Sequence, residues 1–93
     1  MTAPSSDNPL IVQGDFTVLL EVASAHFREA REALLAFAEL VKSPEHFHTY
    51  RITPLSIWNA RAAGLEAGRI LSTLEQFARY PVPGNVAAEI REQ

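Results

Sequence analysis

The sequence predicts a small α+β domain. An antiparallel sheet, made of a hairpin and a third strand, carries one packing helix and is followed by a helical cluster resembling a helix-turn-helix. Residues 10–22 hold two β-rich runs, residues 24–41 place apolar side chains at helical spacing, and Gly and Pro divide residues 53–93 into further helical segments. The length of 93 residues suits one domain, and a hydrophobic share of 47% supports a small core.

The hairpin is expected from two β-rich runs, 10–13 and 17–22, that flank Gly14-Asp15. A short loop with glycine between β-branched runs is typical of a hairpin, and Asp15 suits the turn itself. A helix should follow from a cap at Ser24 and end before Pro44, which disfavours helix in the residue that precedes it. Its apolar stripe is expected to comprise Phe27, Ala30, Leu34, Phe37, Ala38 and Val41.

A third strand is expected at residues 46–52, where side chains alternate in character, and it would pair with the hairpin. Thr53 and Pro54 then indicate a helix start, because threonine caps helices well and proline fits the first helical position. Gly64 would end this helix. The stripe that it buries is expected to be Leu55, Trp58 and Ala62.

Two more helices complete the expected domain. The first, at residues 66–79, should bury Ile70, Leu71, Leu74, Phe77 and Ala78. The segment "YPVPG" breaks it, and a last helix opens at Gly84-Asn85, buries Val86 and Ile90, and is still running at Gln93. Residues 1–8 are polar and small, which is typical of a disordered tail, so residues 9–93 form the expected single domain. Because the last helical pattern has no stop signal, we expect the chain to be part of a longer protein.

Charge and composition limit the possible functions. The formal net charge is -3 and the isoelectric point is about 5.5, whereas a protein that binds nucleic acid by itself is usually basic. Residues 1–50 hold seven acids and three bases, and residues 51–93 hold four acids and five bases, so any DNA contact is expected from the second half. The absence of cysteine excludes disulfides and thiolate chemistry, and the sequence has no secretory signal or membrane-spanning run. A cytoplasmic location is therefore expected.

The candidate DNA-contacting residues are Arg61, Arg69, Gln76 and Arg79. If residues 54–79 form a helix-turn-helix around Gly64, the second helix would expose the last three of them, with arginines for phosphates and a glutamine for a base edge. A plain solvent-exposed face explains the same pattern. Glu66 and Glu75 favour that alternative, since they would repel phosphate and Glu75 can pair with Arg79.

The remaining candidates are weaker. His46 and His48 fall on one face of the expected strand, but zinc needs three or four ligands, so polar residues on an exposed strand are the preferred interpretation. Trp58 could stack on a base, although its place in the expected stripe favours core packing. The sequence has no phosphate-binding loop, no nucleophile motif and no dinucleotide fingerprint. We therefore expect no catalytic site, no bound cofactor and no metal in this chain.

Three segments together resemble the N-terminal domain of bacterial DNA repair helicases of the XPB type, which belong to superfamily two. They are "PLIVQGDFTVLLEV", "FAELVKSPEHFHTYRITPLSIWNARAAGL" and "ILSTLEQFARYPVPGNVAAEI". The resemblance covers residues 9–93, and "HTYRITPLSIWNARAAG" is its most specific part. In that family the domain precedes two motor domains that bind ATP and magnesium and translocate on DNA.

The resemblance implies a non-catalytic accessory domain that positions DNA or a partner protein relative to the motor domains. None of the family's catalytic motifs falls within this chain, so no catalytic residue is carried over. The expected partners are the motor domains of the same protein, DNA and other repair proteins, with no membrane. The alternative is a protein-interaction module without DNA contact, for which Phe16, Phe47 and Leu65 are candidate docking residues.

Overall fold

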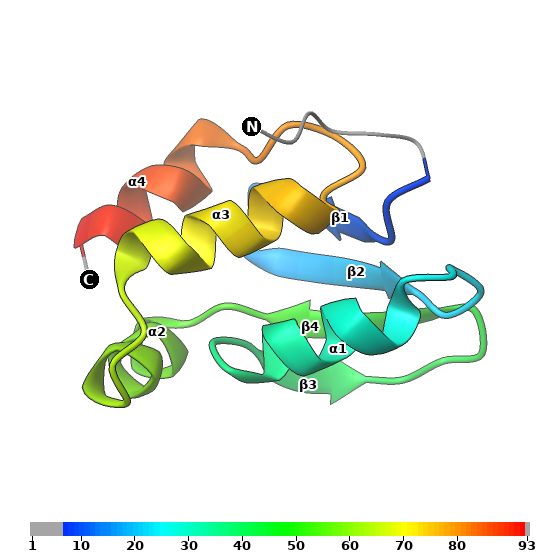
Figure 1. Ribbon diagram of the computed structural model, residues 1–93, viewed down its shortest axis with the longest axis horizontal. Helices are drawn as coiled ribbons and strands as arrows, with labels where there is room; N and C mark the ends of the chain where they lie inside the picture. The colour runs from blue at the N-terminus through cyan, green and yellow to red at the C-terminus, as the bar shows by residue number, and fades with distance from the viewer. Residues whose placement is uncertain (1–6, 93) are drawn as a thin grey trace.

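The computed structural model describes residues 7–92, which form one four-stranded antiparallel sheet and four helices (Figure 1). In chain order the elements are β1 (Leu10–Val12), β2 (Thr17–Glu21), α1 (Phe27–Leu35), β3 (Glu39–Lys42), β4 (Phe47–Arg51), α2 (Pro54–Ala62), α3 (Ala67–Phe77) and α4 (Gly84–Glu92). The strand order is β1-β2-β4-β3. The α+β class and the antiparallel sheet predicted from the sequence are confirmed.

The hairpin of β1 and β2 forms where the sequence predicts it. Its turn runs from Gln13 to Phe16, whose backbone N–H donates to the Gln13 carbonyl over 3.0 Å. Phe16 adopts the left-handed conformation with φ of 72°, which few non-glycine residues do. Asp15 stabilises the turn, since its Oδ1 accepts from the backbone N–H of Thr17 at 3.1 Å and lies 2.6 Å from the Thr17 hydroxyl.

The helix predicted to run to Val41 is wrong in its second half. α1 ends at Leu35, and residues 39–42 form β3, which pairs antiparallel with β4. β3 satisfies the backbone groups on the outer side of β4, which a continued helix would leave without a protein partner. Phe37 and Ala38 are buried as the helical spacing suggested, but they lie in the connection between α1 and β3.

The cap predicted at Ser24 is also displaced. The residue that precedes α1 is His26, and no side chain caps it. Ser24 Oγ accepts a hydrogen bond from the backbone N–H of His26 at 3.1 Å, which closes a small turn ahead of the helix.

One face of the sheet forms the core. Leu10 lies beside Leu20 and Val18 lies beside Tyr50, and all four side chains are almost fully buried. α1 packs against β2 and β3, α3 packs against β1, and α4 packs against α3 (Figure 1). The opposite face carries half-buried residues such as Ile11 and Leu19, as is common for an antiparallel sheet with one solvated side.

The last two helices follow the prediction closely. α3 buries Ile70, Leu71, Leu74 and Phe77, and α4 opens at Gly84 and buries Val86 and Ile90. α4 is held to the hairpin, because Asn85 Nδ2 donates to the Gly14 carbonyl at 2.8 Å. Within residues 7–92, no helix has the length and apolar content that crossing a membrane would require.

The predicted tail at residues 1–8 lies largely outside the described residues. Its last member, Asn8, is ordered against the end of α3, since its amide nitrogen donates to the carbonyls of Gln76 at 3.2 Å and Ala78 at 2.9 Å. The ordered domain therefore starts earlier than the composition of the segment suggested.

Candidate functional site

Three of the four predicted DNA-contacting residues lie on α2 and α3: Arg61 on α2, and Arg69 and Gln76 on α3. α2 starts with a reciprocal cap, in which Ser56 N–H donates to Thr53 Oγ1 at 2.9 Å and Thr53 N–H donates to Ser56 Oγ at 2.8 Å. Pro54 occupies its first turn. These contacts fix the direction of α2 and bury Ser56 with Ile57.

Gly64 ends α2 in a left-handed conformation with φ of 98°. The N–H of Gly64 donates to Arg61 at 2.9 Å and that of Leu65 donates to Ala60 at 3.0 Å, which satisfies carbonyls that the helix end would otherwise leave free. α3 then begins at Ala67. The predicted glycine stop is confirmed, and it places Arg61 in the last turn of α2.

The packing of α2 and α3 differs from that of a DNA-reading helix-turn-helix. In that motif the two helices brace each other and present the second one to the groove. Here α3 packs chiefly against α4 and β1, and α2 stands apart from it at the other end of the sheet (Figure 1). The two helices follow each other in the expected order, but α2 and α3 contact each other less than α3 contacts α4 or β1.

Arg69 and Gln76 are both exposed on α3. They lie seven residues apart, which is two helical turns and about 10 Å along the axis. Thr73, between them, donates its hydroxyl to the Arg69 carbonyl at 2.9 Å. Glu66 and Glu75 are exposed nearby, so the positive potential of this face is partly cancelled.

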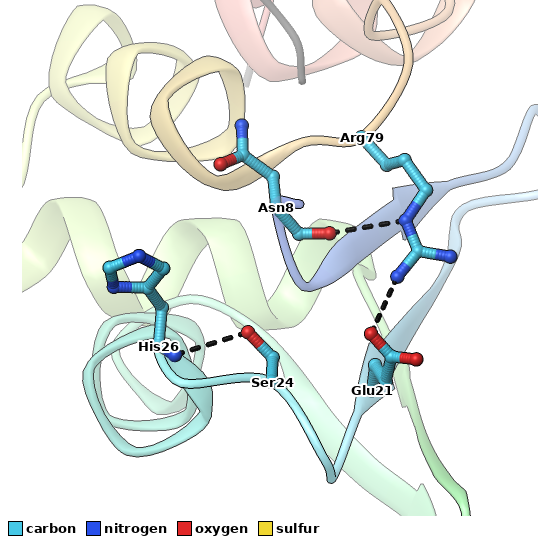
Figure 2. A network of polar contacts seen from close by, with 5 residues as sticks. All are labelled: Asn8, Glu21, Ser24, His26 and Arg79. Atoms are coloured by element: carbon cyan, nitrogen blue, oxygen red, sulfur yellow. Dashed lines mark hydrogen bonds and ion pairs between the residues drawn. The ribbon is translucent and has the colours of Figure 1, made fainter. Parts of the chain in front are cut away.

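Arg79 lies apart from the other three candidates. It falls beyond the end of α3, and its side chain is only 16% exposed. Its Nη2 donates to Glu21 Oε1 at 2.8 Å and its Nε donates to the Asn8 carbonyl at 3.2 Å, as Figure 2 shows. The backbone N–H of Arg79 also bonds to Leu10, whose neighbour across the edge is Ala78. This guanidinium therefore joins the end of α3 to β1 and β2.

Trp58 is the largest departure from the predicted core. It is 63% exposed and Leu55 is 60% exposed, whereas Ile57 and Ala60 face inward. The sequence of α2 offers two apolar stripes at helical spacing, so periodicity alone does not select between them. The docking residues expected from the sequence, Phe16, Phe47 and Leu65, are half-buried rather than exposed. Phe16 and Leu65 pack against the core.

Several large apolar side chains are exposed on α1, β3 and α2. A small hollow lined by Leu35–Glu39, Ser56 and Asn59 joins the end of α1 to α2. Leu35 lines this hollow, and four further exposed large apolar side chains come from β3 and α2: Leu40, Val41, Leu55 and Trp58. Single exposed apolar residues are common on protein surfaces.

A second hollow, of about 640 Å³, lies where the β1–β2 turn, the end of β4, the start of α2 and α4 meet. Its lining residues are Asp15, Phe16, Arg51, Ile52, Thr53, Pro54, Ile57 and Glu89. Hydrogen bonds from the Thr17 hydroxyl and N–H, with a smaller attraction to Arg51, lower the pKa of Asp15 below its ordinary value of 3.8. With one guanidinium and two carboxylates, the hollow lacks the excess positive charge that a phosphate group needs.

The two strand histidines are in different surroundings. The ring of His48 meets Phe27 edge-on, with centroids 5.3 Å apart, while His46 is exposed just before β4. Among residues 7–92, no three histidine, aspartate or glutamate side chains come close enough together to hold a metal ion.

Comparison with known proteins gives a consistent set of relatives. Residues 10–93 match the family described as the helicase conserved C-terminal domain. The chain is similar to the DNA 3'-5' helicase XPB of Kineococcus radiotolerans, with 51% identity over 87 residues. Its identity to the DNA 3'-5' helicase XPB of Mycobacterium tuberculosis is 53% over 85 residues.

A eukaryotic relative is the general transcription and DNA repair factor IIH helicase/translocase subunit XPB of Antonospora locustae, which is 39% identical over 92 residues. These matches cover 94%, 91% and 99% of the present chain but only 16%, 16% and 13% of the relatives. The chain thus spans about a sixth of the length of the two bacterial helicases.

Proposed function

The chain belongs to the family of helicase conserved C-terminal domains, and on that premise we propose that it is a non-catalytic accessory domain of an ATP-dependent DNA repair helicase. Its role is to position DNA or a partner protein relative to the motor domains. The observation that carries this proposal is the identity of 51% and 53% to two DNA 3'-5' helicases over more than nine tenths of the chain.

The proposal assigns ATP and magnesium to the motor domains of the parent protein. Nucleotide hydrolysis of this kind requires a glycine-rich loop with lysine for the phosphates and a carboxylate for the metal. The sequence contains no such loop. The contribution of this domain would therefore be geometric, in that it holds a substrate or partner while another part of the protein performs the chemistry.

We place the domain on the N-terminal side of the motor domains, as the resemblance of the three sequence segments implies. The family description, by contrast, refers to a C-terminal domain. The reading frame of the parent gene tests both positions: a phosphate-binding loop encoded downstream of Gln93 supports ours, and one encoded only upstream of Met1 contradicts it.

For DNA contact, the proposal relies on Arg61, Arg69 and Gln76. All three are exposed, and the two arginines lie in the less acidic half of the chain. Arg79 carries less weight than the sequence suggested, because binding DNA would require it to leave both Glu21 and Asn8. With two arginines available, contact with phosphates should be weak and strongly dependent on salt.

A titration of this chain with duplex, forked and single-stranded DNA at low salt tests the DNA role. We expect weak binding that the double variant R61A/R69A reduces by about tenfold, since each lost phosphate contact lowers affinity at low salt. The matched control is R28A/R31A, which removes two exposed arginines from α1 without touching the proposed surface. Equal loss in both pairs, or no binding to any DNA, would remove the DNA role from this domain.

The exposed apolar side chains on α1 and α2 favour a second candidate function, docking on the motor domains or another protein. Trp58 and Leu55 lie one turn apart on α2, and Leu35 lies on α1 beside the hollow that reaches α2. Exposed tryptophan is a frequent anchor in protein interfaces, and these residues do not support the fold from the inside. This surface replaces Phe16, Phe47 and Leu65 as the place where a partner would bind.

A pull-down with the separately purified motor domains of the parent helicase distinguishes the two functions. Docking predicts retention of this chain without DNA and a large loss in the Trp58→Ala variant. Tyr80→Ala is the matched control, because Tyr80 is similarly exposed but lies beyond α3, outside the surface formed by Leu35, Leu55 and Trp58. Retention that depends on DNA, or that survives Trp58→Ala, would contradict docking through α2.

A further inference from the structure

The two edges of the sheet are closed to different degrees. β1 is flanked by the segment after α3, through the bridge of Leu10 with Ala78 and the hydrogen bonds of Asn8. β3, at the other edge, pairs with β4 on its inner side and has no strand on its outer side among residues 7–92. All four of its residues are exposed, and the side chains of Leu40 and Val41 are 50% and 52% exposed. An apolar edge of this kind is a template for pairing with another strand.

An irregularity in β3 changes how its two charged residues are oriented. Glu39 pairs with Arg51 and Lys42 pairs with Thr49, while Val41 is the extra residue of a bulge. Arg51 and Thr49 are two residues apart on β4, so they point to the same face of the sheet, and their partners Glu39 and Lys42 do so as well. In a regular strand, two residues three positions apart would point to opposite faces.

This arrangement makes the sequence of β3 complementary to itself. When two copies of Glu39–Lys42 run antiparallel about a two-fold axis, the first residue of one meets the last residue of the other. Glu39 then faces Lys42 on a shared face of the sheet, and Leu40 meets Val41 between them. Neither charged side chain forms an ion pair within residues 7–92, so both are available to a partner.

We propose that β3 is a docking edge for a second copy of this chain, which pairs antiparallel so that Glu39 of each copy lies across from Lys42 of the other. Two opposite charges and two apolar contacts are then satisfied at once, which is the set of cross-strand pairs that stabilises antiparallel sheets. An unrelated antiparallel strand would match this edge only if it too carried an acid first and a base three residues later, so the self-complementary pattern favours a second copy.

The proposed dimer should be weak and reversible. β3 has four residues and is followed directly by Ser43 and Pro44, where pairing stops. Bulges and short edges limit strand pairing, and interfaces below about 1,200 Å² are usually transient. The pairing does not depend on the helicase role proposed above, so either proposal can fail without the other.

Charge reversal tests the register directly. In Glu39→Lys both residues of β3 are basic, and in Lys42→Glu both are acidic, so each variant repels its own copies. We expect each to weaken self-association about tenfold or more, as measured by sedimentation velocity over a wide range of concentration. The double variant E39K/K42E restores complementarity and should return to within about threefold of the natural chain. Glu75→Lys, an equal charge change on the exposed face of α3, is the matched control.

Mixing the two single variants provides the sharpest observation. A copy with lysine at both positions and a copy with glutamate at both positions are fully complementary, so an equimolar mixture should form heterodimers although neither variant pairs with itself. Far-UV circular dichroism verifies that each variant keeps its fold. The proposal is overturned if the natural chain stays monomeric at every concentration. The proposal is also overturned if neither charge reversal changes the strength of self-association, since association would then use another surface or register.

Discussion

The β1 edge and the β3 edge of the same sheet are built on different principles. At the β1 edge, residues from the start of the chain meet residues from the end of α3, and a buried leucine, a backbone bridge and an ion pair act together. At the β3 edge, all four residues are exposed and no described segment lies outside them. The β1 edge joins distant parts of the chain, whereas the outer backbone groups and the side chains of β3 face solvent.

This difference separates residues whose side chains hold the fold together from residues whose side chains remain exposed. Sequence alone ranked Arg79 and Arg69 as equal candidates for DNA contact. The structure separates them, because Arg79 holds Glu21 and Asn8 while Arg69 is exposed on α3. The same holds for apolar residues: Leu10 is 1% exposed at the β1 edge and Leu40 is 50% exposed at the β3 edge.

The largest expected effect comes from shortening those two leucines. Leu10→Ala should lower the free energy of unfolding by about 2–5 kcal/mol, because it leaves a cavity in the core. Leu40→Ala should lower it by less than about 1 kcal/mol, since the side chain is already half in water. Urea unfolding followed by far-UV circular dichroism, at a concentration where the chain is monomeric, measures both.

A milder variant keeps this comparison usable if Leu10→Ala does not fold. Leu10→Val removes one methylene group and should cost about 1 kcal/mol, still more than Leu40→Val. Similar losses at the two positions would show that the β3 edge contributes to the fold as much as the β1 edge does, and would remove the contrast between them.

Much of this fold follows from local signals in the sequence. The Gly14-Asp15 turn, the Thr53-Pro54 helix start, the Gly64 stop and the Gly84-Asn85 opening all lie where the sequence predicts them. Asp15 accepts a hydrogen bond within its turn, Thr53 caps α2, and Gly64 adopts the left-handed conformation that glycine tolerates. These signals act within four residues, so reading them requires no knowledge of the tertiary structure. The hairpin and the helices from Thr53 onward were therefore predictable, apart from small shifts in where they begin and end.

The features that sequence reasoning missed depend on distant partners. β3 replaces helix because β4, which follows it, needs a partner on that side, and the helical spacing of Phe37, Ala38 and Val41 conceals this. A four-residue gap containing Pro44 between β3 and β4 was the one available hairpin signal. The contacts of Arg79 join residues 58 and 71 positions apart, which no local pattern reveals.

The candidate site was predictable to a smaller degree. The residue types suited to DNA contact were visible, and Arg61, Arg69 and Gln76 are exposed as expected. Which face of α2 turns outward was not visible, because Leu55 with Trp58 and Ile57 with Ala60 both follow helical spacing. The reciprocal cap of Thr53 and Ser56 fixes that choice by burying Ser56, and with it Ile57.

An intermediate effect is expected from removing the ion pair at the β1 edge. Arg79→Ala should lower the free energy of unfolding by about 1–2 kcal/mol, because hydrogen bonds to a charged group are lost. Solvent weakens this ion pair, since the side chains of Arg79 and Glu21 are 16% and 34% exposed. Arg69→Ala, at an exposed position on α3, should change stability by less than about 0.5 kcal/mol.

The lysine variant shows whether charge or geometry matters at this position. Arg79→Lys keeps the positive charge but lacks the planar guanidinium, which donates to Glu21 and to the Asn8 carbonyl at once. Its stability should fall between those of the natural chain and Arg79→Ala. If chemical denaturation places Arg79→Ala level with Arg69→Ala, Arg79 does not stabilise the β1 edge and returns to the set of free candidates for DNA contact.

The smallest effect concerns the turn that joins β1 to β2. The pKa of Asp15 is lowered from 3.8, chiefly by the Thr17 hydroxyl, so its carboxylate favours the folded state. Because the folded-state pKa is the lower one, this contribution is fully present above the unfolded-state value near 3.8 and is lost as pH falls through the folded-state value.

An NMR titration of the side-chain carboxyl carbons should show Asp15 titrating below 3.8 in the natural chain. In Thr17→Val, which keeps the shape of the buried side chain, the pKa should move back up. If the pKa is the same in both proteins, the hydroxyl is not its cause, and the Thr17 N–H that also donates to Asp15 would account for the lowered pKa.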